Sequence, residues 1–147
     1  MVRAILGVII GYVVTAVFIF AFFTLAYLAM GADMAFKPGT YDLSLIWIII
    51  SFIVNAIAAV IGGFVCAAIS RSIRAAQVFA GIVLVLGILL AIPILRGTDR
   101  RVNIRRDAVS NIQAMRNART PGWVALLNPV VGAVGILIGA GLKKTRD

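Results

Sequence analysis

The segment Leu43–Ser70 reads LSLIWIIISFIVNAIAAVIGGFVCAAIS and contains no charged residue. About 20 helical residues cross a hydrocarbon layer of roughly 30 Å, so this segment is long enough to span a membrane. Three other segments share this character, and all 14 basic and 5 acidic residues lie outside the four: Ala4–Ala32, Ala75–Leu95 and Gly122–Leu142. The sequence therefore predicts an all-α membrane protein, a four-transmembrane-helix bundle with spans near residues 4–30, 45–70, 75–95 and 122–142.

The first two connections between the predicted spans are short. Gly31–Asp42 carries the turn signal Pro38-Gly39, and Arg71–Arg74 leaves room only for a tight hairpin. The apolar run that starts at Ala4 exceeds the roughly 7–15 residues of a signal-peptide core, so we expect the first helix to be retained. Short connections keep successive helices side by side, which predicts a single integral membrane domain over residues 1–147.

The third connection, residues 96–121, is the one long polar segment, and it holds seven arginines and two aspartates. Four apolar residues recur in it at helical spacing, which indicates an amphipathic helix on the membrane surface with Asp107 as its N-cap. These apolar residues are Ile104, Ala108, Ile112 and Met115. A solvated, partly disordered loop is the alternative.

The arginines of this connection are the candidate contacts for anionic lipid headgroups or for an acidic partner. An amphipathic helix lying on the membrane would hold them close to the headgroups. The connection has no aromatic residue on which a base could stack, so the net charge of +9 does not indicate nucleic-acid binding. The candidate residues are Arg100, Arg101, Arg105, Arg106, Arg116 and Arg119.

The basic residues also bear on the orientation of the chain. If both termini are cytoplasmic, six basic residues lie inside and eight outside, a count that slightly favours the inverted orientation. The first helix often dominates insertion, however, and Arg3, the Arg71–Arg74 turn and the Lys143–Arg146 tail form one basic edge. We therefore expect a multi-pass protein of the cell (inner) membrane with both termini cytoplasmic.

One face of the second span carries a small or neutral polar residue at every fourth position. Small residues let backbones approach closely, and an asparagine can hydrogen-bond to another helix for roughly 0.6–2 kcal/mol. This stripe therefore predicts a helix contact, with a substrate contact at Asn55 as the alternative. Its residues are Ser51, Asn55, Ala59, Gly63 and Ala67.

Two other spans carry G-x-x-x-G spacing, with Gly7 and Gly11 in the first span and Gly135 and Gly139 in the fourth. Both pairs predict close packing on another helix of this chain or on a second copy, in a homo-oligomer or a larger membrane complex. Spacing does not separate these cases, because both contacts use the same physics. Asn128 stands before Pro129, which predicts a kink with Asn128 bonded to freed backbone.

Four aromatic residues fall near the ends of predicted spans that meet one membrane surface. Tryptophan and tyrosine are enriched where hydrocarbon meets headgroups, because their rings are apolar and their tips polar. We therefore expect an interfacial aromatic belt formed by Tyr27, Tyr41, Trp47 and Trp123.

The missing residue types exclude most enzymatic sites. The chain has no histidine and no glutamate, and its five aspartates lie outside the spans. A serine mechanism therefore lacks its usual base, an aspartyl site lacks two facing carboxylates within the membrane, and an H-E-x-x-H zinc site is impossible. The single cysteine, Cys66, forms neither an intrachain disulfide nor a thiolate cluster. We expect no catalytic residue, no cofactor and no metal.

These observations together predict a small non-enzymatic integral membrane protein with a structural role, as an accessory subunit or a membrane-surface organiser. Its glycine-rich faces would dock other helices, and its basic connection would engage anionic lipid or an acidic partner. The alternative is a small oligomeric channel, facilitator or transporter, in which several copies arrange their few polar residues around a path.

Overall fold

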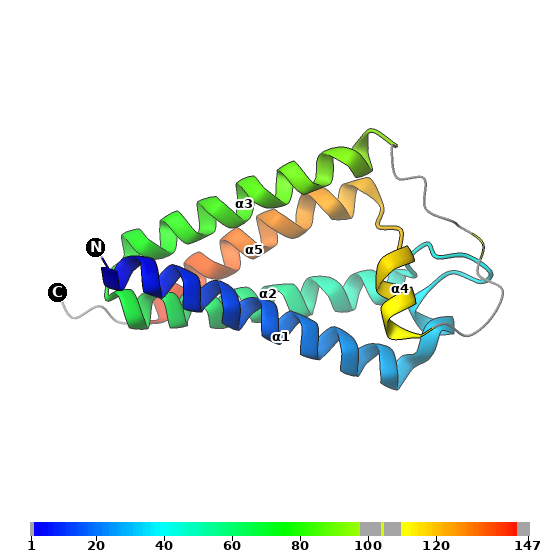
Figure 1. Cartoon of the computed structure of the whole chain (residues 1–147), viewed down its shortest axis with the longest axis horizontal. Coiled ribbons are helices and arrows are strands. Elements are labelled where there is room, and N and C mark those ends of the chain that lie inside the picture. The colour runs from blue at the N-terminus through cyan, green and yellow to red at the C-terminus, as the bar shows by residue number, and fades with distance from the viewer. Residues whose placement is uncertain (1, 98–103, 105–109, 144–147) are drawn as a thin grey trace.

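Within the residues that the structure describes, which are 2–97, 104 and 110–143, the chain forms four long helices and one short helix (Figure 1). In this computed structural model they are α1 (Val2–Ala35), α2 (Leu45–Ser70), α3 (Ile73–Leu95), α4 (Asn111–Asn117) and α5 (Gly122–Leu142). The four long helices are long and apolar enough to cross a membrane. The predicted all-α bundle is confirmed, and the chain has the make-up of a multi-pass membrane protein.

The helices α2 and α5 have the predicted bounds, whereas α1 and α3 are longer than expected. α1 continues to Ala35 after a local break at Gly31, where φ is 72°, a value that glycine adopts without steric cost. α3 starts at Ile73 because the turn before it needs only two residues. The first of these, Arg71, takes a left-handed φ of 53°, and its backbone N–H donates to the carbonyl of Ala67 at 3.0 Å.

One serine joins the end of α1 to the start of α2. The hydroxyl oxygen of Ser44 accepts a hydrogen bond from the backbone N–H of Trp47 at 3.1 Å, which caps α2. The same hydroxyl donates to the carbonyl of Met34, and the backbone N–H of Ser44 donates to the carbonyl of Ala35 at 3.0 Å. Ser44 thus pairs backbone carbonyls at the end of α1 and a backbone N–H at the start of α2, which would otherwise have no partner within their helices. These bonds fix how the two helices meet.

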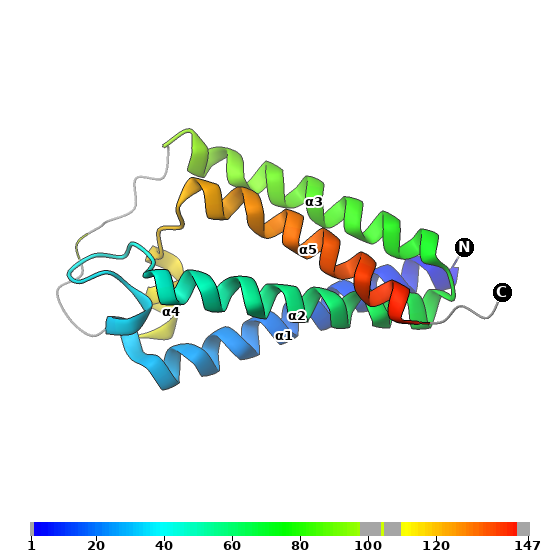
Figure 2. The ribbon, with the colours of Figure 1, turned by 180° about the vertical axis from the view of Figure 1, so that it is seen from behind.

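The bundle is narrow at one end and wide at the other. α2 packs against both α1 and α5, and α5 packs in turn against α3. At the narrow end, where α1 begins and α5 ends, α1 and α3 also touch. Toward the other end the α1–α2 pair diverges from the α3–α5 pair, and α4 lies across the opening (Figures 1 and 2).

Close packing closes the narrow end. Phe79, Cys66 and Ile136, from three helices, are each at most 1% exposed and form one cluster with several alanines. Beside this cluster, the Lys143 ammonium donates to the carbonyls of Ala67 and Ala68 at 3.2 and 2.9 Å. A cation at the end of a helix complements the partial negative charge of its last carbonyls, so Lys143 ties the end of α5 to the end of α2.

The wide end has a second apolar cluster beneath the connecting segments. The chain before α5 is pinned to the first connection, since Arg119 donates its backbone N–H to the Tyr41 carbonyl at 2.9 Å and accepts from Leu43 at 3.3 Å. Tyr27 and Tyr41 lie inside this cluster, each only 7% exposed. They therefore do not face outward in an aromatic belt, because both pack within this cluster, whereas Trp123 is 52% exposed.

The short helix α4 is the described part of the predicted amphipathic helix. It begins later than expected, because its N-cap is Ser110, whose hydroxyl accepts from the backbone N–H of Gln113, and not Asp107. Ile104 is not helical but forms an isolated bridge with Thr40 and is exposed. Asp107 and Ala108 lie outside the described residues.

Candidate functional site

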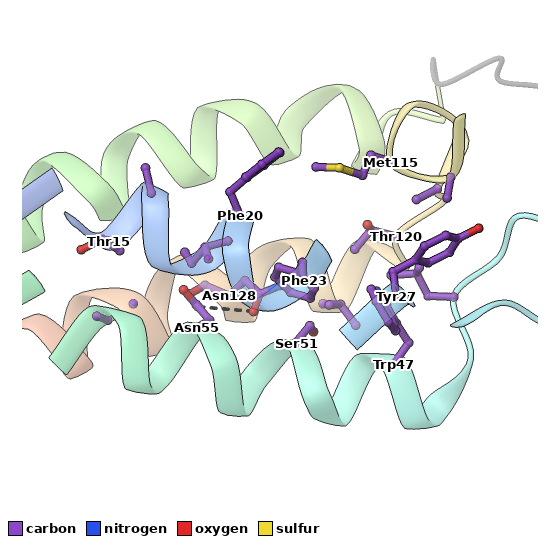
Figure 3. Close-up of a pocket in the computed structure, with 18 of the residues that line it drawn as sticks. Thr15, Phe20, Phe23, Tyr27, Trp47, Ser51, Asn55, Met115, Thr120 and Asn128 are labelled. Atoms are coloured by element: carbon purple, nitrogen blue, oxygen red, sulfur yellow. Dashed lines mark hydrogen bonds between the residues drawn. The ribbon is translucent and has the colours of Figure 1, made fainter. Parts of the chain in front are cut away.

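The divergence of the two helix pairs leaves a cavity of about 560 Å³ at the wide end (Figure 3). Helices α1, α2 and α5 form its sides, and residues of and next to α4 lie across its top. Most of its wall is apolar. Aromatic and aliphatic side chains dominate it, among them Phe20, Phe23, Trp47, Met115 and Val124. This volume lies within the roughly 300–1,000 Å³ of sites that bind small molecules.

Besides the tyrosines Tyr12 and Tyr27, a few side chains with amide or aliphatic hydroxyl groups interrupt the apolar wall: Thr15, Ser51, Asn55, Asn111, Thr120 and Asn128. Among the described residues that line the cavity there is no Asp, Glu, Lys or Arg. A charged group brought here would have no opposite charge on the wall, and an unpaired charge in an apolar setting is strongly disfavoured. The cavity therefore suits a neutral molecule.

Two asparagines from different helices meet on the wall. The side-chain amide of Asn55 on α2 donates to the backbone carbonyl of Asn128 on α5 at 2.8 Å and lies 3.4 Å from the side-chain oxygen of Asn128. Figure 3 shows the pair facing the cavity beside Ser51 and Phe23. Asn55 thus joins α2 to α5 at the point where close packing gives way to the cavity.

The hydroxyl groups near this pair use their own helices as acceptors. Ser51 donates to the carbonyl of Ile48 at 2.7 Å, and Thr15 donates to the carbonyl of Gly11 at 2.8 Å. In such a bond to the preceding turn the hydroxyl hydrogen is already donated, and the hydroxyl oxygen can still accept a hydrogen bond. These two side chains therefore offer acceptors, not donors, to a molecule in the cavity.

A second hollow of about 390 Å³ continues from the same wall toward α3. Ser51, Asn55 and Asn128 line both spaces. The second hollow adds residues of α3, including Gly87, Leu90 and Ile94. Leu90, which lines the second hollow, is 75% exposed. The second hollow therefore opens to the outside of the bundle between α1 and α3, within the apolar part of these helices.

The stripe of small and polar residues predicted on α2 has two different surroundings. Ser51 and Asn55 face the cavity, whereas Gly63 lies against the backbone of Ile136 on α5. Gly135 and Gly139 face α2 from the other side: a Cβ on Gly135 would lie 2.7 Å from that of Ala59, and one on Gly139 would overlap the Val60 carbonyl.

The first glycine pair lies against α2 as well. A Cβ on Gly7 would be 2.8 Å from the carbonyl oxygen of Cys66, and one on Gly11 would be 2.9 Å from that of Gly62. All five glycines singled out in the sequence are therefore placed against helices of this same chain. Asn128 contributes to the contact between α5 and α2 in a different way: its backbone carbonyl accepts a hydrogen bond from the side-chain amide of Asn55.

The arginines named as candidate headgroup contacts are described only in part. Arg116 lies on α4 and is exposed, and Arg119 lies between α4 and α5 and is half-buried. Both are at the wide end, above the cavity. The other four, Arg100, Arg101, Arg105 and Arg106, lie outside the described residues.

Sequence reasoning did not find the cavity or the pairing of Asn55 with Asn128. A usable signal was present, since these are the two side-chain amides within the second and fourth spans, and polar groups at membrane depth seek one another. Gly132 and Gly87 were also missed. Gly132 lines the cavity, and a Cβ on Gly87 would collide with the ring of Pro129, so α3 and α5 meet there closely.

Comparison with known proteins finds neither a family for this chain nor a relative of the same fold. No protein-family model matches the chain, and no curated protein and no solved structure matches it. The geometry of the bundle and its cavity is therefore what bears on function.

Proposed function

We propose that this chain is a non-enzymatic multi-pass membrane protein that binds a neutral, largely apolar molecule inside its helix bundle. The cavity of about 560 Å³ carries this proposal, because it combines an apolar wall with a few convergent neutral polar groups. The described residues that line the cavity include no His, Glu, Asp or Lys, the side chains that act most often as general acids and bases. Binding, without chemical conversion, is the activity that these groups support.

The two functions expected from the sequence draw less support. The glycine faces that suggested docking to other proteins are covered by helices of the same chain, which removes the main reason for an accessory role. Close packing of α1, α2, α3 and α5 at the narrow end disfavours a path through a single copy. A path between several copies, the alternative expected from the sequence, stays a prediction. Contact of Arg116 and Arg119 with anionic headgroups remains compatible with a binding protein and is part of the proposal.

Filling the cavity tests the proposal. Gly132 lines it, and a Cβ there would make only ordinary contacts, 3.4 Å from Val83 and 3.8 Å from Asn55. We expect Gly132→Leu to place a side chain in the cavity and to abolish saturable labelling by a photoactivatable hexadecyl methyl ether. The measurement is photolabelling of the purified protein in phosphatidylcholine nanodiscs, with labelled residues mapped by mass spectrometry.

The matched control is Gly141→Leu on the same helix, where an added Cβ meets no atom within 4 Å. This variant should keep the saturable labelling of the parent. Labelling of Leu28, which is 70% exposed on α1, should not saturate in any variant and reports contact with bulk lipid. Equal saturable labelling of both leucine variants, with unchanged melting, would contradict the proposal.

The proposal includes a cell (inner) membrane location with both termini cytoplasmic. The narrow end is where α1 and α3 begin and α2 and α5 end (Figure 1). The helix bounds place Arg3, Arg71, Arg74 and Lys143 at these ends, and this basic edge supports that orientation. We expect Lys37→Cys, in the exposed connection at the wide end, to react with a membrane-impermeant thiol reagent in intact cells. Arg74→Cys should stay protected until the cells are permeabilised, and native Cys66 is buried and adds no background. The reverse pattern would invert the orientation.

A further inference from the structure

The pair formed by Asn55 and Asn128 has hydrogen-bonding capacity that its own contacts do not use. A side-chain amide offers two N–H donors and one oxygen acceptor. Asn55 donates to the carbonyl of Asn128, but among the described residues no donor reaches the side-chain oxygen of Asn55, and no acceptor pairs with the side-chain N–H groups of Asn128. The acceptor oxygen of Asn55 and the N–H donors of Asn128 therefore remain unused on two side chains that line the same cavity (Figure 3).

The space around this pair leads sideways, toward lipid. Asn55 and Asn128 line both the main cavity and the hollow that extends to Leu90 and Ile94 on α3. Leu90 is one of the most exposed apolar side chains of the bundle, at 75%. A molecule already dissolved in the membrane can thus reach the amides between α1 and α3 without crossing the polar connections.

The chemistry of the pair selects among neutral molecules. A hydroxyl group both donates and accepts, so it satisfies the oxygen of Asn55 and the N–H of Asn128 together. An ether or ester oxygen accepts only and leaves the Asn55 oxygen without a partner. A carboxylate also cannot donate, and its charge would meet no cation among the described residues that line the wall.

We infer that the cavity takes a long-chain lipid alcohol, with its hydroxyl between Asn55 and Asn128 and its chain lying toward the gap between α1 and α3. This inference rests on the proposed binding function and specifies its ligand. The hydroxyl donates to the side-chain oxygen of Asn55 and accepts from the side-chain N–H of Asn128, while the apolar wall surrounds the first part of the chain.

The experiment compares hexadecanol with hexadecyl methyl ether, both carrying the same diazirine at mid-chain, in phosphatidylcholine nanodiscs. In the unaltered protein the alcohol should reach half-saturation at about tenfold lower concentration than the ether, because it makes one more hydrogen bond. Asn55→Leu should reduce this difference to about twofold or less. Gln77→Leu, which removes an exposed amide on α3 away from the cavity, should preserve it.

The outcomes separate the inference from the proposed function. If alcohol and ether saturate at the same concentration and Gly132→Leu abolishes both, the cavity binds apolar molecules and the hydroxyl assignment is overturned. If neither probe labels the cavity saturably, the binding function itself fails. Labelling by the alcohol probe at residues away from Leu90 and Ile94 would overturn the placement of its alkyl chain. The comparison of the two probes uses the unaltered protein, so it does not depend on the folding of any variant.

Discussion

Alanine at Gly139 or at Gly63 is expected to destabilise the bundle by about 3 kcal/mol or more, although alanine is the better helix former by about 1 kcal/mol. The reason is the closeness of α2 and α5. A Cβ at Gly139 would overlap the Val60 carbonyl, and one at Gly63 would overlap the Ile136 carbonyl. Since the obstacle is backbone and not a flexible side chain, a whole helix must shift to make room.

The same chain offers two control positions for this prediction. Gly81 on α3 and Gly141 on α5 are exposed, and an added Cβ meets no atom within 4 Å at either. Alanine there should leave stability unchanged or raise it by about 0.5–1 kcal/mol. Titration with sodium dodecyl sulfate in mixed micelles, followed by circular dichroism, measures all four variants. A loss at Gly63 and Gly139 no larger than at the controls would refute the close contact.

The number and the ends of the long helices could be predicted because charge is so costly in hydrocarbon. Every charged residue lies outside the four spans, so the ends of the apolar segments mark the ends of the helices. The error at α1 has a local cause: Gly31 breaks the helix without ending it, so the helix runs on past Asp33 to Ala35. The charge of Asp33 did not stop the helix from continuing, because this end of α1 lies among the polar connections at the wide end of the bundle.

The partners of the glycine faces could not be predicted from spacing. Gly7 and Gly11 face the end of α2, and Gly135 and Gly139 face the middle of α2, yet the same G-x-x-x-G pattern fits contact with another protein equally well. What decides between these cases is the order in which the helices pack. Two short connections hold α1, α2 and α3 in sequence, but α5 inserts between α2 and α3, which no local pattern requires.

The cavity was beyond prediction because it arises where helices separate. Its wall joins side chains that lie more than a hundred positions apart, from Tyr12 to Ile136, and each one alone fits an ordinary packing position. Ser51 shows the difficulty. At 6% exposure it continues the packing stripe of α2, yet it also lines the cavity.

Aspartate at Asn55 should be far more damaging than leucine at the same position, and the difference isolates the role of the amide. Asn55 reaches the Asn128 carbonyl oxygen through its N–H at 2.8 Å. A carboxylate accepts but does not donate, so two acceptors would face each other at this distance. An ionised group at the centre of a span also costs about 2.5–3.5 kcal/mol by insertion scales.

We therefore expect Asn55→Asp to lower the stability of the bundle by about 3 kcal/mol or more. Asn55→Leu removes one interhelical hydrogen bond without adding charge, and it should cost about 1 kcal/mol. Gln77→Glu on α3 provides the matched control, because that exposed side chain lies near the basic narrow end, and its effect should stay within about 0.5 kcal/mol. Unfolding in mixed micelles, followed by the fluorescence of Trp47 in a Trp123→Phe background, ranks the three variants. Equal losses for aspartate and leucine would mean that Asn55 faces water, and the hydrogen bond between α2 and α5 would then not hold the cavity wall together.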